Sequence, residues 1–186
     1  MTVQDALRMY FAKIRSPQYF PMYPVRYDPD AAKRVLAGQY LVPREKTPDF
    51  SAFEREFGIP LPEDLRAYYS TWHPYLTGGH PGNPHKRECV VLEDSLHADP
   101  CAVLCEDMRS CAEDYPDLRF IPVGGISYVW ERVLFERATG KIFVEYSWDA
   151  DGENMREPAA EDCIWKQPLA NSLAGLICTL NPYPYE

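Results

Sequence analysis

Apolar residues near the start of the chain recur every three or four positions, which is the spacing of one helix face. Thr2 and Asp5 resemble a capping box, with Asp in the place of Glu. The apolar stripe that follows consists of Val3, Leu7, Tyr10, Phe11 and Ile14. A Pro- and Tyr-rich stretch, 16–29, predicts an extended segment. A short helix is expected over 30–37 and a short strand over 40–42.

A helix–corner–helix unit is predicted over residues 47–72. Thr47 is expected to cap the first helix, with Pro48 at its first helical position. Gly58 suits the left-handed residue that ends this helix, and Pro62 can open the next one. The apolar positions of the two helices are Phe50, Phe53 and Phe57, then Leu65, Tyr68, Tyr69 and Trp72. Two apolar faces held at a fixed corner must pack on a larger structure.

Further along the chain, helix and strand patterns alternate. Asp99 can cap a helix that begins at Pro100, and apolar residues at helical spacing follow it. These residues are Cys101, Cys105, Met108 and Ala112. Residues 77–86, rich in Gly and Pro, predict a loop. Short apolar or alternating runs predict strands over 89–92, 120–123, 129–135 and 141–148.

The last two predicted strands should form an antiparallel hairpin, because only a short turn through Ala138-Thr139-Gly140 connects them. Gly140 is expected at positive φ. A final helix is expected to open at Pro168, and its apolar face consists of Leu169, Leu173, Leu176, Ile177 and Leu180. Helices combined with hairpin-connected strands predict the α+β fold class: a single domain in which helices pack on a largely antiparallel sheet.

Several of these segments resemble, in order and spacing, the motifs of the SUKH superfamily. The family pattern is an acidic helix, a small-residue stop, a Leu-Pro corner, an acidic pair, an aromatic helix, and then a strand, a turn and a hairpin. The matching residues here are 53–58, 61–64, Tyr68-Tyr69, 120–125, 133–135, 139–143 and 169–182. The best match covers residues 47–182. Residues 1–46 match loosely, and Ser16-Pro17 is followed by Gln18 where Syd-type members have cysteine.

The resemblance implies a SUKH-like fold and a role in protein binding without catalysis. Members include bacterial toxin-immunity proteins, Syd and yeast cell-wall-synthesis regulators. The implied function is that of a bacterial immunity protein, which neutralises a toxin domain such as a nuclease through an acidic surface. The alternative within the family is a Syd-like protein that contacts cytoplasmic loops of the SecY translocon. Neither role needs a cofactor.

Composition and charge narrow the classes of partner. The chain has 186 residues, of which 46% are hydrophobic and 13% aromatic, with a formal net charge of −9. This charge disfavours nucleic acid and favours a protein partner with a basic surface. Acidic residues are concentrated over 93–117 and 145–162. The sequence shows neither an apolar run long enough to span a membrane nor a secretory signal, so a cytoplasmic location and six reduced cysteines are expected.

Aromatic and acidic residues lie close together around the predicted hairpin. The aromatic residues are Tyr128, Trp130, Tyr146 and Trp148. The candidate partner-binding residues are Glu131, Glu145, Trp148, Asp149, Asp151 and Glu153. Two interpretations stay open. The aromatic side chains can belong to the core with the acids as a solvated rim, or together they can form a groove that receives a basic peptide or loop.

The alternative from another class is a small enzyme that uses the His80/His85 loop with a cysteine. No serine-hydrolase, Walker or dinucleotide motif is present in the sequence, so no catalytic residue is assigned. Several possible zinc ligands are close in sequence: His80, His85, Cys89, His97, Cys101 and Cys105. They contain no Cys-x2-Cys pair, and Cys101 and Cys105 fit a core stripe, so no metal site is predicted.

Overall fold

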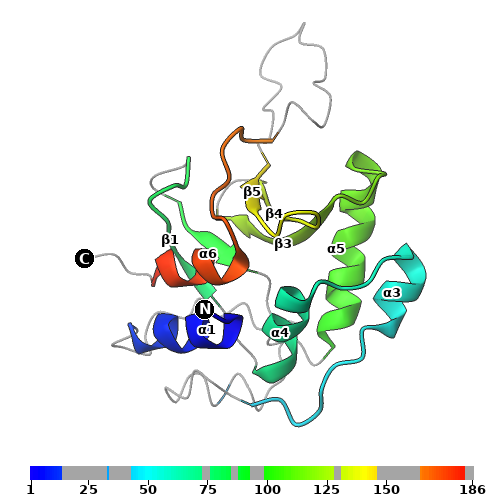
Figure 1. Ribbon diagram of the computed structural model, residues 1–186, viewed down its shortest axis with the longest axis horizontal. Coiled ribbons are helices and arrows are strands. Elements are labelled where there is room, and N and C mark those ends of the chain that lie inside the picture. Colours follow the sequence, from blue (N-terminus) through cyan, green and yellow to red (C-terminus); the bar gives the residue numbers. More distant parts are fainter. Residues whose placement is uncertain are drawn as a thin grey trace, which may run out of the picture.

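A computed structural model describes residues 1–13, 33, 43–72, 76–84, 88–92, 99–127, 131–145 and 164–182. The helices of this part of the chain are α1 (Val3–Ala12), α3 (Ser51–Phe57), α4 (Glu63–Thr71), α5 (Pro100–Asp114) and α6 (Leu173–Thr179) (Figure 1). Its strands are β1 (Leu76–Gly79), β2 (Val90–Leu92), β3 (Phe120–Ile126), β4 (Arg132–Glu136), β5 (Ile142–Val144) and β6 (Asn181–Pro182). Among the described helices, none has both the length and the apolar character that crossing a bilayer requires.

The strands form one antiparallel sheet in the order β5-β4-β3-β2-β1-β6. The predicted α+β fold class is therefore confirmed. In the β4–β5 hairpin Val133 pairs with Val144, and Gly140 in the turn has a φ of 72°, as predicted. The register of β3 on β4 shifts between Pro122 and Gly124. Pro122 has no N–H to donate to a ladder, which suits a bulge.

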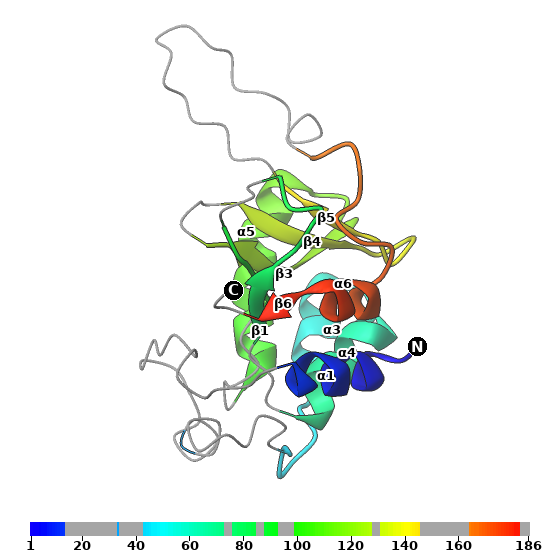
Figure 2. The same cartoon turned by 90° about the vertical axis from the view of Figure 1, so that its left-hand side faces the viewer.

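Side chains are buried on both faces of the sheet. In β4, Val133 and Phe135 belong to the main core, whereas Leu134 belongs to a second, smaller cluster. The helices α1, α3, α4 and α6 contribute to the main core and lie together below β4 and β5 in Figure 2. The second cluster consists of Cys111, Tyr115, Phe120 and Leu134. Because α5 contributes its first turns to the main core and its end to the second cluster, it joins the two.

The N-terminal helix α1 begins as predicted. Thr2 and Asp5 form a complete capping box, in which the Asp5 N–H donates to Thr2 Oγ1 over 3.1 Å. On the buried side of α1, Tyr10 is 1% exposed, and its hydroxyl donates to the Thr77 carbonyl over 2.8 Å. The Thr77 N–H donates back to the same hydroxyl over 3.2 Å. Tyr10 therefore fixes α1 to β1, and its hydroxyl is satisfied in the core.

The prediction of a loop over residues 77–86 is wrong at its start, because Leu76–Gly79 forms strand β1. Gly78 in this strand serves close packing rather than a turn. A Cβ at Gly78 would lie 2.3 Å from the carbonyl oxygen of Asn181 in β6. Gly is thus the residue that lets β1 and β6 approach each other. The turn that follows is ordered by Asn83, whose side chain donates to the Glu88 carbonyl over 2.9 Å.

The predicted starts of two helices are also wrong. Helix α3 begins at Ser51 rather than at Pro48, and Asp49, not Thr47, accepts the Ser51 N–H over 2.9 Å. Its end is as predicted, since Gly58 has a φ of 65°. Helix α6 begins at Leu173, with Ser172 as its cap, rather than at Pro168.

The late start of α6 has a tertiary cause. The segment before it runs beside β5, and its backbone groups bond to that strand. The Leu169 N–H donates to the Ile142 carbonyl over 2.7 Å, and the Ile142 N–H donates to the Ala170 carbonyl over 2.9 Å. The N–H of Trp165 donates to the Val144 carbonyl over 3.0 Å. Pairing with a neighbouring strand therefore overrides the helical pattern of this segment.

Other predicted elements agree more closely with the structure or lie outside the described residues. The helix that begins at Pro100 is capped by Asp99 as predicted, with the Cys101 N–H donating to Asp99 Oδ1 over 3.1 Å. The strand predicted to end at residue 123 continues to Ile126. Apart from Lys33, the helix predicted over 30–37 and the strand predicted over 40–42 lie outside the described residues, as does the end of the strand predicted over 141–148.

Candidate functional site

Two of the six predicted partner-binding residues lie in the described part of the chain. Glu131 precedes β4 and is 3% exposed, and its backbone carbonyl accepts the Ile126 N–H over 3.0 Å. Glu145 directly follows β5, and its side chain is 12% exposed. Neither carboxylate is a solvated rim group. The other four predicted residues, Trp148, Asp149, Asp151 and Glu153, lie outside the described residues, as do the hairpin aromatics Tyr128, Trp130 and Tyr146.

Glu145 belongs to a compact ionic group that we call the Arg132 cluster, comprising Arg132, Glu145, Asp114 and Tyr115. Arg132 Nη2 donates to Glu145 Oε1 over 2.7 Å, and its Nε bonds to Glu145 Oε2. The two bonds are parallel, which is the strong bidentate form of this pair. Arg132 Nη2 also bonds to Asp114 Oδ2, and the Tyr115 hydroxyl donates to Glu145 Oε1 over 2.9 Å.

The local fold explains why these four residues meet. Arg132 opens β4 and Glu145 follows β5, and the Glu145 N–H donates to the Arg132 carbonyl over 2.8 Å. The two side chains are therefore direct cross-strand neighbours of opposite charge. Asp114 and Tyr115 lie at the C-terminal end of α5, which packs against β3. The end of α5 thus brings a second carboxylate to the same guanidinium.

The pKa values of the cluster follow from burial and hydrogen bonding. Burial alone lowers the pKa of Arg132, but its hydrogen bonds to Glu145 and Asp114 outweigh that effect and raise the pKa above its usual value. Burial raises the pKa of Tyr115, and the adjacent Glu145 carboxylate raises it further. Arg132 therefore stays charged and Tyr115 stays neutral at physiological pH.

Aromatic rings lie beside the cluster on its buried side. The Arg132 guanidinium lies 6.0 Å from the centroid of the Tyr115 ring, and the Tyr115 ring meets Phe120 edge-on with centroids 5.0 Å apart. Arg119 lies 4.8 Å from the Phe120 centroid. Aromatic rings and carboxylates thus meet at the base of the hairpin, but these rings are not the predicted ones, which lie outside the described residues. Here the rings belong to the protein's own core, and the carboxylates bond to its own arginine.

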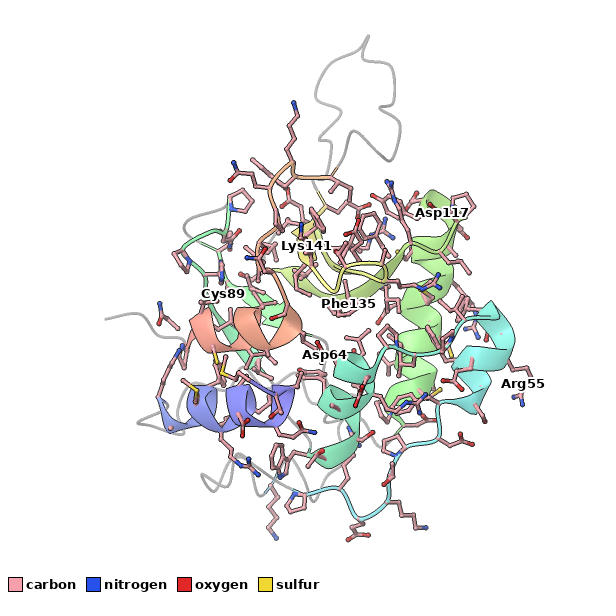
Figure 3. The ribbon with its side chains drawn as sticks, viewed as in Figure 1. Arg55, Asp64, Cys89, Asp117, Phe135 and Lys141 are labelled. Atoms are coloured by element: carbon pink, nitrogen blue, oxygen red, sulfur yellow. The ribbon has the colours of Figure 1, made fainter. Side chains whose placement is uncertain are left out.

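Solvated acids lie instead along the outer side of α5. We call this surface the α5 acidic face; it consists of the exposed residues Glu106, Glu113, Asp114 and Asp117. Figure 3 labels Asp117 at the outer end of the helix. Arg109 lies on the same side, and its guanidinium bonds to Glu56 of α3 over 2.6 and 2.9 Å. That pair is internally neutral, so the face stays negative in sum.

The cysteines of α5 are poor candidates for nucleophiles. Cys101, Cys105 and Cys111 are each buried. Burial raises the pKa of the Cys111 thiol to about 12, and burial together with Cys101 raises that of Cys105 to about 11. A thiol with such a pKa is almost wholly protonated at neutral pH, so it lacks the thiolate that reacts.

His80 accepts the Gly82 N–H at Nδ1 over 3.0 Å, which holds its ring in the turn after β1.

The described residues contain no group of three or more His, Cys, Asp or Glu side chains that could hold a metal ion. Of the possible zinc ligands weighed in the sequence, His85 and His97 lie outside the described residues.

Sequence reasoning missed Arg132, Asp114 and Tyr115. A usable signal for Arg132 was present: counting outward from the predicted turn at Gly140 places residue 132 opposite residue 145 on the paired strand. For Asp114 and Tyr115 no local signal exists, since their approach depends on how α5 packs on the sheet.

No family model matches the chain, and no curated protein matches it significantly in sequence.

Proposed function

We propose that this chain is a protein-binding module without catalytic activity. In line with the resemblance to SUKH proteins, we propose that it is a cytoplasmic bacterial immunity protein, which neutralises a toxin domain by covering a basic surface. The observation that carries the proposal is the α5 acidic face: Glu106, Glu113, Asp114 and Asp117 are exposed along one helix and its C-terminal end.

The physical reasoning is electrostatic. The chain has a net charge of −9, so its field attracts a positively charged partner over several ångströms of solvent. Nuclease domains bind phosphates through basic surfaces, and an acidic helix can occupy such a surface. Interactions of this kind accelerate association more than they slow dissociation, and salt screens them.

Rigidity of the α5 acidic face supports the same role. The buried side of α5 contributes to both hydrophobic clusters, and its ends are held by the Asp99 cap and by the Arg132 cluster. The helix therefore presents its carboxylates without first having to become ordered, which lowers the entropic cost of binding.

The enzyme alternative draws less support from the described residues. The buried thiols of Cys105 and Cys111 have raised pKa values, and the charged groups at the base of the hairpin already bond to one another. Both features are typical of structural groups rather than of groups poised for proton transfer.

The test uses the toxin domain encoded next to this gene in its host, expressed as an inactive variant for binding and as an active one for growth. Glu106→Lys combined with Glu113→Lys should slow association by about tenfold at low salt and abolish growth rescue. Glu45→Lys combined with Glu63→Lys is the matched control, because both residues are exposed and the change in net charge is the same.

The control pair should change the association rate by no more than about twofold. Equal losses in the two double variants would mean that only net charge matters, which contradicts a binding role for α5. An affinity that does not depend on salt would also contradict it. Binding to peptides from the cytoplasmic loops of SecY, without rescue from the toxin, would favour the Syd-like alternative.

A further inference from the structure

Three sulfur atoms lie together where α1 meets α6, away from the Arg132 cluster. Cys178 Sγ of α6 lies 3.4 Å from the Sδ atom of Met1 and 3.9 Å from the Sδ atom of Met9. Figure 3 shows yellow sulfur atoms at this junction of the two helices. One thiol is therefore in contact with two thioethers that are eight positions apart in the sequence.

Both thioethers are unusually exposed for apolar side chains. Met1 is 71% exposed and Met9 is 52% exposed, while Cys178 is half-buried between them. Among the described residues, the large hydrophobic side chains that stay exposed are Met1, Met9 and Trp165. Two of these three converge on the same thiol. Core packing does not account for that arrangement, because the two methionine side chains remain largely in solvent.

The junction itself is well fixed. The Lys13 ammonium group donates to the carbonyl of Cys178 over 2.6 Å and to that of Leu180 over 2.9 Å. It thereby satisfies carbonyls at the C-terminal end of α6, where a cation is favourable. Because Lys13 follows directly after α1, these bonds hold Cys178 in place beside the helix that carries Met9.

We propose that Cys178, Met9 and Met1 form a binding site for a soft monovalent metal ion, Cu(I). Thiolate and thioether sulfur atoms are the ligands that Cu(I) prefers, whereas hard cations such as Mg²⁺ and Ca²⁺ prefer oxygen. The cysteine supplies one negative charge, so its complex with Cu(I) is neutral. Binding replaces the thiol proton: the Cys178 S–H bond breaks, a Cu–S bond forms, and the proton passes to solvent.

The sulfur spacing suits this ion. With metal–sulfur bonds of about 2.3 Å, three ligands at the corners of a triangle lie about 4 Å apart. The separations of 3.4 and 3.9 Å between Cys178 and the two methionines are close to that value. Methionine has three flexible torsions, so small adjustments of Met1 and Met9 can complete the triangle.

The test is a competition for Cu(I) between the full chain and the chelator bathocuproine disulfonate, followed by absorbance without oxygen. Intact mass should show that Met1 is retained in the purified chain, and its removal would overturn the three-sulfur site. Met9→Leu keeps size and polarity at an exposed site, and should weaken Cu(I) binding roughly tenfold or more. Cys178→Ser should abolish it. Cys89→Ser is the matched control, since Cys89 is the other half-buried cysteine of the described residues. This variant should bind one equivalent of Cu(I), as the unmodified chain does.

X-ray absorption at the copper edge should give sulfur neighbours alone, at about 2.3 Å. An unchanged affinity of Met9→Leu for Cu(I) would mean that Met9 is not a ligand, and it would overturn the proposal. So would failure of the unmodified chain to compete, or binding that survives in Cys178→Ser. Matching thermal stability of the metal-free variants verifies that any loss reflects the ligands and not the fold.

Discussion

The pairing of Arg132 with Glu145 should be far more stabilising than its pairing with Asp114, although the two carboxylates contact the same guanidinium. The difference follows from exposure. Glu145 is 12% exposed and Arg132 is 23% exposed, whereas Asp114 is 49% exposed. Solvent screens the Asp114 pair, and such pairs contribute about 0–1 kcal/mol. Breaking a fully buried pair costs about 3–5 kcal/mol, because one charge is left without a partner.

The perturbation is Arg132→Met, which keeps the length of the side chain and removes its charge. Since Arg132 is not fully buried, we expect a loss of about 2–3 kcal/mol in the free energy of unfolding, somewhat below the fully buried range. For a chain of this size that corresponds to a decrease in Tm of about 5–10 °C. Arg66→Met is the control. Its pair with Glu54 has side chains that are 43% and 37% exposed, so the expected cost is about 1 kcal/mol or less.

Double-mutant cycles in urea separate the two carboxylates. Arg132→Met is combined with Glu145→Gln in one cycle and with Asp114→Asn in the other, and unfolding is followed by circular dichroism. The coupling energy should be about 1.5 kcal/mol or more with Glu145 and about 0.5 kcal/mol with Asp114. Equal coupling energies, or a value near zero for Glu145, would refute the reasoning from burial.

Three further predictions concern stability, each measured by urea or thermal unfolding. Burial raises the pKa of Cys111 to about 12 from an ordinary value of 9.0, so above pH 9 the unfolded chain loses a proton that the folded chain keeps. The free energy of unfolding should therefore fall as pH rises from 9 toward 12, and it should fall less steeply in Cys111→Ala. Gly78→Ala should lower the free energy of unfolding by about 1–3 kcal/mol, because its Cβ would lie 2.3 Å from the Asn181 carbonyl oxygen. A loss no greater than that of an Ala substitution at an exposed position would contradict this contact. Ser172→Ala should cost about 1 kcal/mol, because the Gly175 N–H donates to Ser172 Oγ over 3.0 Å, and Ser172→Asp should restore most of it.

Local signals in the sequence were sufficient wherever one residue type determines the backbone. The Thr2–Asp5 box, the Asp99 cap and the positive φ of Gly58 and Gly140 were all predicted and are all present. Each depends on a hydrogen bond or a conformation within a few residues. The α+β class followed as well, because the hairpin turn and the helical stripes are local patterns.

Features set by distant parts of the chain were not predictable in the same way. Residues 77–79 have the composition of a loop, yet Gly78 lies in a strand because Asn181 approaches it closely. The helical stripe that includes Leu169 lost its first turn to hydrogen bonds with Ile142 of β5. Glu145 was chosen as a contact residue for its charge, but its arginine partner became apparent only with the strand register.

The same distinction between local signals and distant contacts applies to the candidate site. That the chain is acidic, and that residues 93–117 carry many of the acids, could be read directly from the sequence. Which of these carboxylates face solvent depends on the rotation of α5 about its axis, which its packing on β3 and α3 determines. The contact of Cys178 with Met1 and Met9 was beyond prediction, since it joins residues from opposite ends of the sequence.

The attachment of α1 to α6 also affects how the chain folds. Lys13 bonds to the carbonyls of Cys178 and Leu180, and the first of these bonds joins residues 165 positions apart. Contacts of such long range form late and slow the folding reaction. Before α6 docks, the apolar side of α1, with Leu7 and Phe11, lacks one of the surfaces it packs against. A partly folded chain therefore exposes an apolar helix, and this makes aggregation a hazard during refolding.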